Sequence, residues 1–196
     1  QGGLGAATAA AKGNAVLALR GRDIVELRLH IEPSDAPAVR RSRVTATERV
    51  VCTLPDVAPS TALNPSCDGK YVAFGAAASA DKRRGPAIFK VHLKTGRLTE
   101  VCRLPDPPGF GGHVQWSRTH PHLLSFAGGR GPTRDVAGPA RPSSGPTDYA
   151  QRGHQRLWVV DVRDGIPRNV YQAEEGELVT HEMWWVRDQL LFCGGK

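Results

Sequence analysis

The chain has 196 residues, of which 40% are hydrophobic and 23% are charged, the balance of an ordinary soluble globular protein. No stretch approaches the roughly 18–20 uninterrupted apolar residues of a membrane-spanning helix, so we expect no membrane partner. The formal net charge is +7, but lysine and arginine are scattered along the chain, so we expect no nucleic-acid partner. The 22 glycines and 15 prolines favour many turns over a helical bundle.

The four cysteines predict a reducing compartment. They are far apart and form no C-x-x-C pair, which argues against a zinc ribbon or a thioredoxin-like motif. Isolated cysteines of this kind are typical of reduced proteins, so we expect a cytoplasmic location. Residues 1–11 lack the basic and apolar regions of a signal peptide, and there is no initiator methionine, so we expect a fragment or a processed form.

A pattern of short alternating strands and glycine turns recurs along the chain. Strands with period-two alternation and glycine turns indicate antiparallel sheets, and repeats of about 40–50 residues match the blades of a β-propeller. In chain order the predicted strands are 15–19, 24–29 and 50–54; then 71–74, 88–93 and 98–104; then 123–126, 157–162 and 169–171; and finally 183–185 and 190–193.

We therefore predict an all-β fold, a partial β-propeller of about three to four blades. The blades are expected at residues 13–60, 61–110, 111–178 and, incomplete, 179–196. Residues 128–153, rich in glycine, proline, serine and arginine, are expected to be an inserted surface loop in the third blade. A piece of a larger ring is the preferred interpretation, and a four-bladed ring closed by the partial repeats is the alternative.

Two of the seven histidines occupy matching positions, because His113 and His181 each come just before the first strand of a blade. The innermost strands of a propeller line its central channel, so equivalent positions in neighbouring blades converge near the axis. Two imidazoles brought together there could serve as metal ligand and general base, although both residues could also be ordinary parts of a blade. His120 and His122 have a spacing that could bind a metal, but they are predicted to fill a turn.

Several segments resemble the oligogalacturonate lyase family. His113–Ser117 and Pro121–Phe126 resemble that family's H-x-Q-F-S-P-T-D-P-x-L-x-x-F segment. Arg156–Asp161 resembles its R-x-W segment, and Gly176–Trp184 its G-E-x-x-x-H-E-F-W segment, in the same order. The resemblance extends from about Asn64 to Phe192. It implies a seven-bladed propeller and a manganese-dependent β-elimination on oligogalacturonates, the acidic oligosaccharides of pectin.

The resemblance also implies roles for single residues. A neutral imidazole can remove the weakly acidic C5 proton of a uronate near pH 7, and the planar fork of arginine matches a carboxylate. Further manganese ligands are expected in a later blade, beyond Lys196. Carried over position by position, the implied roles are base for His113, manganese ligand for His181, and substrate binding for Gln115, Arg84, Arg156 and Glu182.

Two other functions are compatible with the same pattern of strands. The first is a non-catalytic TolB-like propeller that binds a protein or a glycan, because a fold does not dictate a function. The second is a propeller attached to a hydrolase domain. The sequence has no G-x-S-x-G nucleophile motif, so the second alternative has little support.

Overall fold

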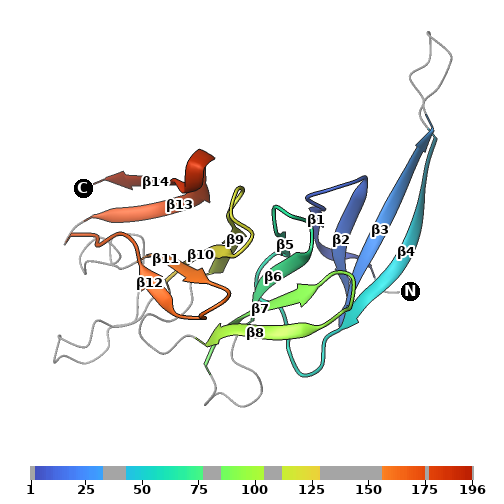
Figure 1. Ribbon diagram of the computed structural model, residues 1–196, viewed down its shortest axis with the longest axis horizontal. Helices are drawn as coiled ribbons and strands as arrows, with labels where there is room; N and C mark the ends of the chain where they lie inside the picture. The colour runs from blue at the N-terminus through green and yellow to red at the C-terminus, as the bar shows by residue number, and fades with distance from the viewer. Residues whose placement is uncertain are drawn as a thin grey trace, which may run out of the picture.

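The computed structural model describes residues 3–32, 43–76, 85–103, 112–128, 156–174 and 177–195 (Figure 1). Its helical content within these residues is the short 3-10 turn η2, Val186–Asp188, and no helix among them is long and apolar enough to cross a membrane. The strands are β1 Gly5–Ala9, β2 Ala15–Arg20, β3 Asp23–Glu32, β4 Arg43–Thr53, β5 Asn64–Pro65, β6 Tyr71–Ala76, β7 Ala87–His92, β8 Leu98–Arg103, β9 Gly112–Trp116, β10 Leu123–Ala127, β11 Leu157–Asp161, β12 Pro167–Asn169, β13 Leu178–Trp184 and β14 Leu190–Gly195.

These strands form successive antiparallel sheets, each made of neighbours in the chain. Strands β1–β4, β5–β8 and β9–β12 make three four-stranded sheets, and β13 pairs with β14. The predicted all-β partial propeller is confirmed, with one sheet as one blade. The first and last sheets lie at opposite ends of the molecule in Figure 1, so the described residues do not close into a ring of four blades.

The first sheet begins earlier than the sequence predicts. Strand β1 starts at Gly5 and pairs with β2, so this sheet starts before the boundary expected at residue 13. The expected loop at 128–153 lies, apart from Gly128, outside the described residues. The other blade boundaries and the size of the complete ring stay predictions.

The hydrophobic core lies between successive sheets, and strand β6 illustrates why. Val72 and Phe74 are buried against Leu17 of the first sheet, whereas Ala73 packs with Trp116 of the third. A strand covered on both faces reads as an almost continuous apolar run, which is the pattern of residues in β6. Phe74 is fully buried, and removing a side chain of this size from water stabilises the fold by about 2–3 kcal/mol.

Two glycine turns bring neighbouring sheets into direct backbone contact. Gly96 lies between β7 and β8, and Gly165 lies at the equivalent place between β11 and β12. Their φ angles are 68° and 67°. A Cβ atom at Gly96 would lie 2.3 Å from the carbonyl oxygen of Val51, and one at Gly165 would lie 2.4 Å from that of Val101. Each turn therefore packs on the outer strand of the preceding sheet, where a side chain does not fit.

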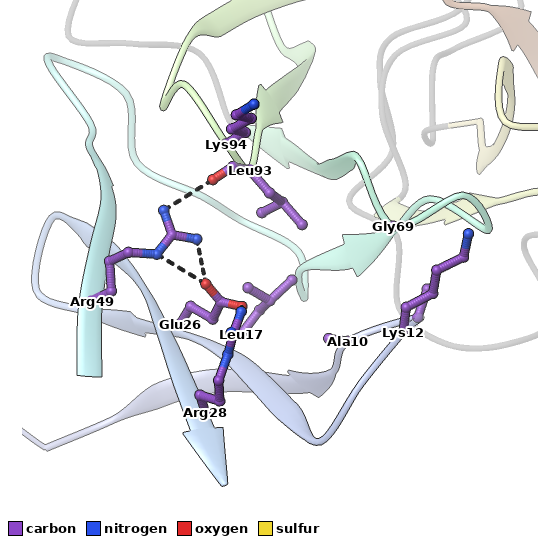
Figure 2. A pocket seen from close by; sticks show the side chains of 10 residues that line it. Ala10, Lys12, Leu17, Glu26, Arg28, Arg49, Gly69, Leu93 and Lys94 are labelled. Carbon is purple, nitrogen blue, oxygen red and sulfur yellow. Dashed lines mark hydrogen bonds and ion pairs between the residues drawn. The ribbon is translucent and has the colours of Figure 1, made fainter. Parts of the chain in front are cut away.

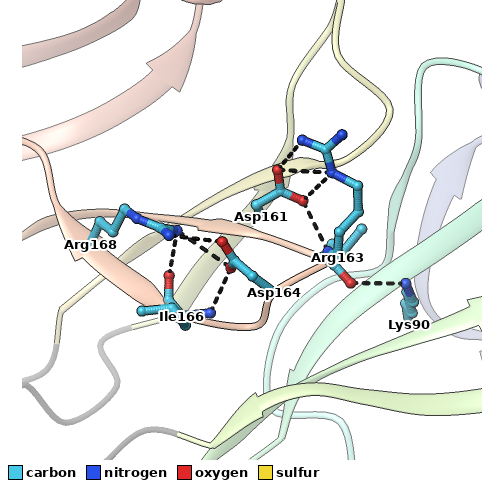
Figure 3. A network of polar contacts seen from close by, with 7 residues as sticks. Lys90, Asp161, Arg163, Asp164, Ile166 and Arg168 are labelled. Atoms are coloured by element: carbon cyan, nitrogen blue, oxygen red, sulfur yellow. Dashed lines mark hydrogen bonds and ion pairs between the residues drawn. The ribbon is translucent and has the colours of Figure 1, made fainter.

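A polar network holds the Gly165 turn against the second sheet (Figure 3). The Lys90 ammonium in β7 donates to the carbonyl oxygen of Val162, at 3.3 Å. The Asp161 carboxylate accepts from the backbone N–H of Arg163 at 2.9 Å and from its guanidinium at 2.5 Å. These hydrogen bonds from Arg163 lower the pKa of Asp161 to about 2, although partial burial acts in the opposite direction.

The low pKa of Asp161 predicts a loss of stability in acid. Because the pKa in the fold lies below the ordinary value of 3.8, the carboxylate stabilises the protein above that pH. This contribution is lost as the pH falls from about 4 to 2. We expect Asp161→Asn to reduce the acid-induced loss over this range, measured as the urea midpoint at successive pH values. Asp56→Asn, at a fully exposed carboxylate, is the control; an identical acid profile for the wild type and Asp161→Asn would contradict the assignment.

Candidate functional site

The inner strands β9 and β13 carry a β-bulge at the same relative position. In each strand one extra residue is inserted opposite its pairing partner. His113 and His181 lie in these bulges, with φ angles of 54° and 53°. This left-handed backbone costs a non-glycine residue about 1–2 kcal/mol. Because strain of this kind gathers at functional sites, its repetition in two neighbouring blades makes this end of the inner strands the candidate site.

The imidazole of His113 is held by a buried carboxylate from the next blade. Its Nδ1 lies 3.0 Å from Oε1 of Glu182. The Glu182 side chain is 1% exposed, whereas the His113 side chain is 48% exposed. The carboxylate accepts a hydrogen bond from the N–H at Nδ1, so in the neutral ring Nε2 keeps its lone pair. The arrangement fixes one tautomer and leaves the basic nitrogen available to a ligand.

Arg156 balances the charge of the buried Glu182. Its side chain, just before β11, donates from Nε to Oε2 at 2.9 Å and from Nη2 to Oε1 at 3.2 Å. A bidentate pair of this kind compensates the cost of burying a carboxylate, which is high when the carboxylate has no partner. Nη1 makes no hydrogen bond to any residue that the structure describes, and the Arg156 side chain is 20% exposed.

Gln115 and Trp184 fix the two inner strands side by side. The Gln115 side-chain amide donates to the backbone carbonyl of Glu182 at 2.9 Å. The Trp184 indole donates to the backbone carbonyl of Gln115 at 3.0 Å. These bonds run in both directions between β9 and β13, so they position the backbone from which Glu182 reaches His113.

The structure thus brings together four of the six residues that the sequence singles out. His113, Gln115, Arg156 and Glu182 are joined by hydrogen bonds within one cluster. His181 directly precedes Glu182 and is exposed; its imidazole makes no hydrogen bond to the residues that the structure describes. Arg84 lies outside the described residues.

The burial of Glu182 suits a positioning residue better than a direct ligand of a substrate. Both carboxylate oxygens are already occupied by protein groups, and the side chain is almost inaccessible. The positioning role of Glu182 could have been suspected from the sequence by comparing the two inner strands. When the two bulged strands are aligned, Glu182 matches the buried Val114, and a carboxylate at a buried position calls for a cationic partner.

A second polar cluster, at the far end of β9, has no counterpart in the sequence predictions. His120 lies in a turn, as predicted, and its Nε2 is 2.6 Å from Oδ2 of Asp188. The Asp188 carboxylate also accepts hydrogen bonds from the hydroxyls of Ser117, at 2.6 Å, and Thr119, at 2.5 Å. Burial opposes the charged form, but these hydrogen bonds outweigh it and lower the pKa of Asp188. The cluster joins the third sheet to the turn between β13 and β14.

The described residues do not form a metal centre. No group of three or more histidine, cysteine, aspartate or glutamate side chains among them could hold a metal ion. Glu182 is already paired with Arg156 and His113, which leaves the exposed imidazole of His181 as the predicted metal ligand in this region. One imidazole is a poor site for manganese, which prefers several hard ligands.

Solved structures with a similar fold include two oligogalacturonate lyases. An oligogalacturonate lyase in complex with manganese shares 17% sequence identity with this chain, with a TM-score of 0.63 over 97% of this chain and 46% of that one. The oligogalacturonate lyase from Vibrio parahaemolyticus also shares 17% identity, with a TM-score of 0.59 over 91% of this chain and 43% of that one. The chain therefore spans less than half the length of these structures.

At this level of identity the similarity establishes the β-propeller fold. No protein-family model matches the sequence, and no curated protein matches it.

Proposed function

We propose that this chain forms part of a lyase that cleaves an acidic oligosaccharide, an oligogalacturonide of pectin, by β-elimination. The observation that carries the proposal is the His113 imidazole, half-exposed in a strained bulge and held by the buried Glu182 carboxylate. The likeness of the fold to oligogalacturonate lyases supports the choice of substrate class.

In the proposed reaction His113 is the general base. The C5 proton of a galacturonate is weakly acidic, because C5 is the carbon to which the carboxylate is attached. Nε2 of the neutral imidazole takes this proton, and the bonding electrons form the C4–C5 double bond. The C4–O bond breaks, and its electron pair leaves on the oxygen, which is then protonated. No water enters the products, and the new non-reducing end is an unsaturated uronate.

Glu182 stabilises the imidazolium that forms when His113 accepts the proton. A carboxylate on Nδ1 both fixes the tautomer of the base and compensates its positive charge, as in other paired imidazoles. Arg156 holds Glu182 in place through Nε and Nη2, and we propose that its Nη1 contacts a uronate carboxylate. Gln115 secures the backbone that presents this pair.

Manganese has no complete site among the described residues. His181 is the single ligand that we propose for a divalent cation, and the donor set around it does not fit manganese. The proposed reaction therefore uses only the protein's own residues. His181 is exposed beside Glu182, where it can contact a ligand that reaches Nε2 of His113.

The proposal is tested by following digalacturonate cleavage in ultraviolet absorbance. The product absorbs because its new C4–C5 double bond is conjugated with the carboxylate. The full-length protein is incubated with and without manganese, and new reducing ends are measured in parallel. We expect absorbance and reducing ends to rise together. Reducing ends without absorbance would indicate hydrolysis, and substrate binding without either product would favour a non-catalytic glycan-binding propeller; both results would contradict the proposal.

A further inference from the structure

A hollow lined by basic side chains lies between the first and second sheets (Figure 2). It encloses about 350 Å³, enough for a sugar-sized ligand. Strands β2, β3 and β4 contribute Leu17, Glu26, Arg28 and Arg49. The turns after β1, β5 and β7 contribute the remaining wall, which consists of Ala10, Ala11, Lys12, Gly69, Leu93 and Lys94.

The single carboxylate in this hollow is already paired. Glu26 accepts from Nε of Arg49 at 3.0 Å and lies 3.4 Å from Nη2 of Arg28. Arg49 also donates from Nη1 to the backbone carbonyl of Leu93 at 3.2 Å, which fixes its guanidinium across the joint between the two sheets. Burial opposes the charged form of Glu26, but these two arginines outweigh it and lower its pKa, so Glu26 stays ionised near neutral pH.

The lysines give the hollow an excess of positive charge. Lys12 and Lys94 approach it from two sides in Figure 2, and neither forms an ion pair with the residues that the structure describes. The methylene groups of Lys12 pack against Gly69, where an added Cβ would lie 3.4 Å away, so the stem of this lysine is supported. Four cations, Lys12, Arg28, Arg49 and Lys94, face one carboxylate, which leaves a net charge of about +3.

The hollow is separate from the candidate active site. Gly69 follows the inner strand β5, whereas His113 begins the equivalent inner strand β9. The two sites therefore lie at opposite ends of the inner strands, and a ligand in one does not touch the residues of the other.

We propose that this hollow binds a small multivalent oxyanion, a ligand that carries phosphate or several carboxylate groups. Arg49 and Glu26 hold each other in place by hydrogen bonding, while Lys12 and Lys94 supply exposed ammonium groups that can contact the anion. Such a ligand would sit across the joint between two blades and stabilise it by binding only the folded protein.

The test is calorimetric titration of the full chain, at low ionic strength, with pyrophosphate and, separately, with citrate. Pyrophosphate represents ligands whose anionic oxygens belong to phosphate groups, and citrate represents ligands whose anionic oxygens belong to carboxylates. We expect at least one of them to bind, and we expect Lys12→Gln with Lys94→Gln to raise its Kd by about tenfold or more, because charged hydrogen bonds to the anion are lost. The anion that binds more tightly identifies the source.

The double variant Arg43→Gln with Arg118→Gln is the matched control, because it removes two exposed positive charges that do not line the hollow. The control should bind like the wild type. The proposal would be overturned if neither anion bound the wild type, if the lysine variant bound as tightly as the wild type, or if the control lost affinity to the same extent. None of these results depends on the His113 site, so the proposed lyase activity is tested separately.

Discussion

Replacing His113 with asparagine should lower kcat for digalacturonate cleavage by about two to four orders of magnitude, the usual contribution of a general base. Asparagine tolerates the left-handed backbone of this position, and its amide can still donate to Glu182. The fold and the substrate site should therefore survive the change. Initial rates by ultraviolet absorbance give kcat, and calorimetry with digalacturonate gives Kd, which we expect to change little.

The control for this variant is His30→Asn. His30 is an exposed histidine of β3, and its ring nitrogen contacts the hydroxyl of Thr47 at 3.4 Å. This change should leave kcat unaltered. If the His113 variant kept wild-type turnover, His113 would not be the base; if it lost substrate binding and turnover together, its role would be binding rather than proton transfer.

Replacing Gly165 with alanine should destabilise the protein by about 3 kcal/mol, the upper end of the cost of local backbone strain. The new Cβ atom would lie 2.4 Å from the carbonyl oxygen of Val101, and the φ angle of 67° is unfavourable for alanine. The second and third sheets would have to separate to accommodate it. The free energy of unfolding, obtained from urea titration, measures the effect.

Gly13→Ala is the matched control for the Gly165 variant. Gly13 has a φ angle of 76°, but an added Cβ there meets no atom within 4 Å. This variant should lose about 1 kcal/mol, the cost of the left-handed backbone alone. Equal losses at the two positions would show that the contact between sheets adds nothing to the strain of the turn.

The strands that the sequence predicts best are those buried on both faces. The sequence predicts strands at 71–74 and 157–162, because these apolar runs are bounded by clear turns. Residues 71–74 lie in β6, and all of the second range except its last residue lies in β11. The short inner strands are harder to predict. Strand β5 consists of Asn64 and Pro65 alone, and a two-residue strand that contains proline has no recognisable periodicity.

Strand β4 shows a different limit of prediction. It runs over Arg43–Thr53. The sequence predicts a strand only over 50–54, because residues 43–49 are mostly polar and show little hydrophobic alternation. These residues form a strand because they pair with the extended β3, as in the contact between Glu26 and Arg49. This part of β4 is therefore stabilised by its pairing with β3, and a search for alternating hydrophobic residues does not detect it.

The candidate site was only partly accessible to sequence reasoning. The positions of His113 and His181 at the start of inner strands follow from the repeat, and their matching bulges agree with it. The partnership of Glu182 with Arg156 does not follow, because a bulge inserts one residue and so changes which side chains face the neighbouring blade. Contacts of this kind depend on backbone geometry that spacing along the chain does not encode.

The glycine joints have a consequence for how such a molecule can diversify. Gly96 and Gly165 contact the preceding blade at the backbone carbonyl groups of Val51 and Val101. Every amino acid has such a carbonyl group, so the contact does not depend on the side chains of the preceding blade. A repeat connected in this way can be duplicated, and each copy can exchange its side chains while the stacking of the copies is retained. Different side chains can then occupy equivalent positions in the copies, as His113 and His181 do in two of them, while the turns that join the copies stay the same.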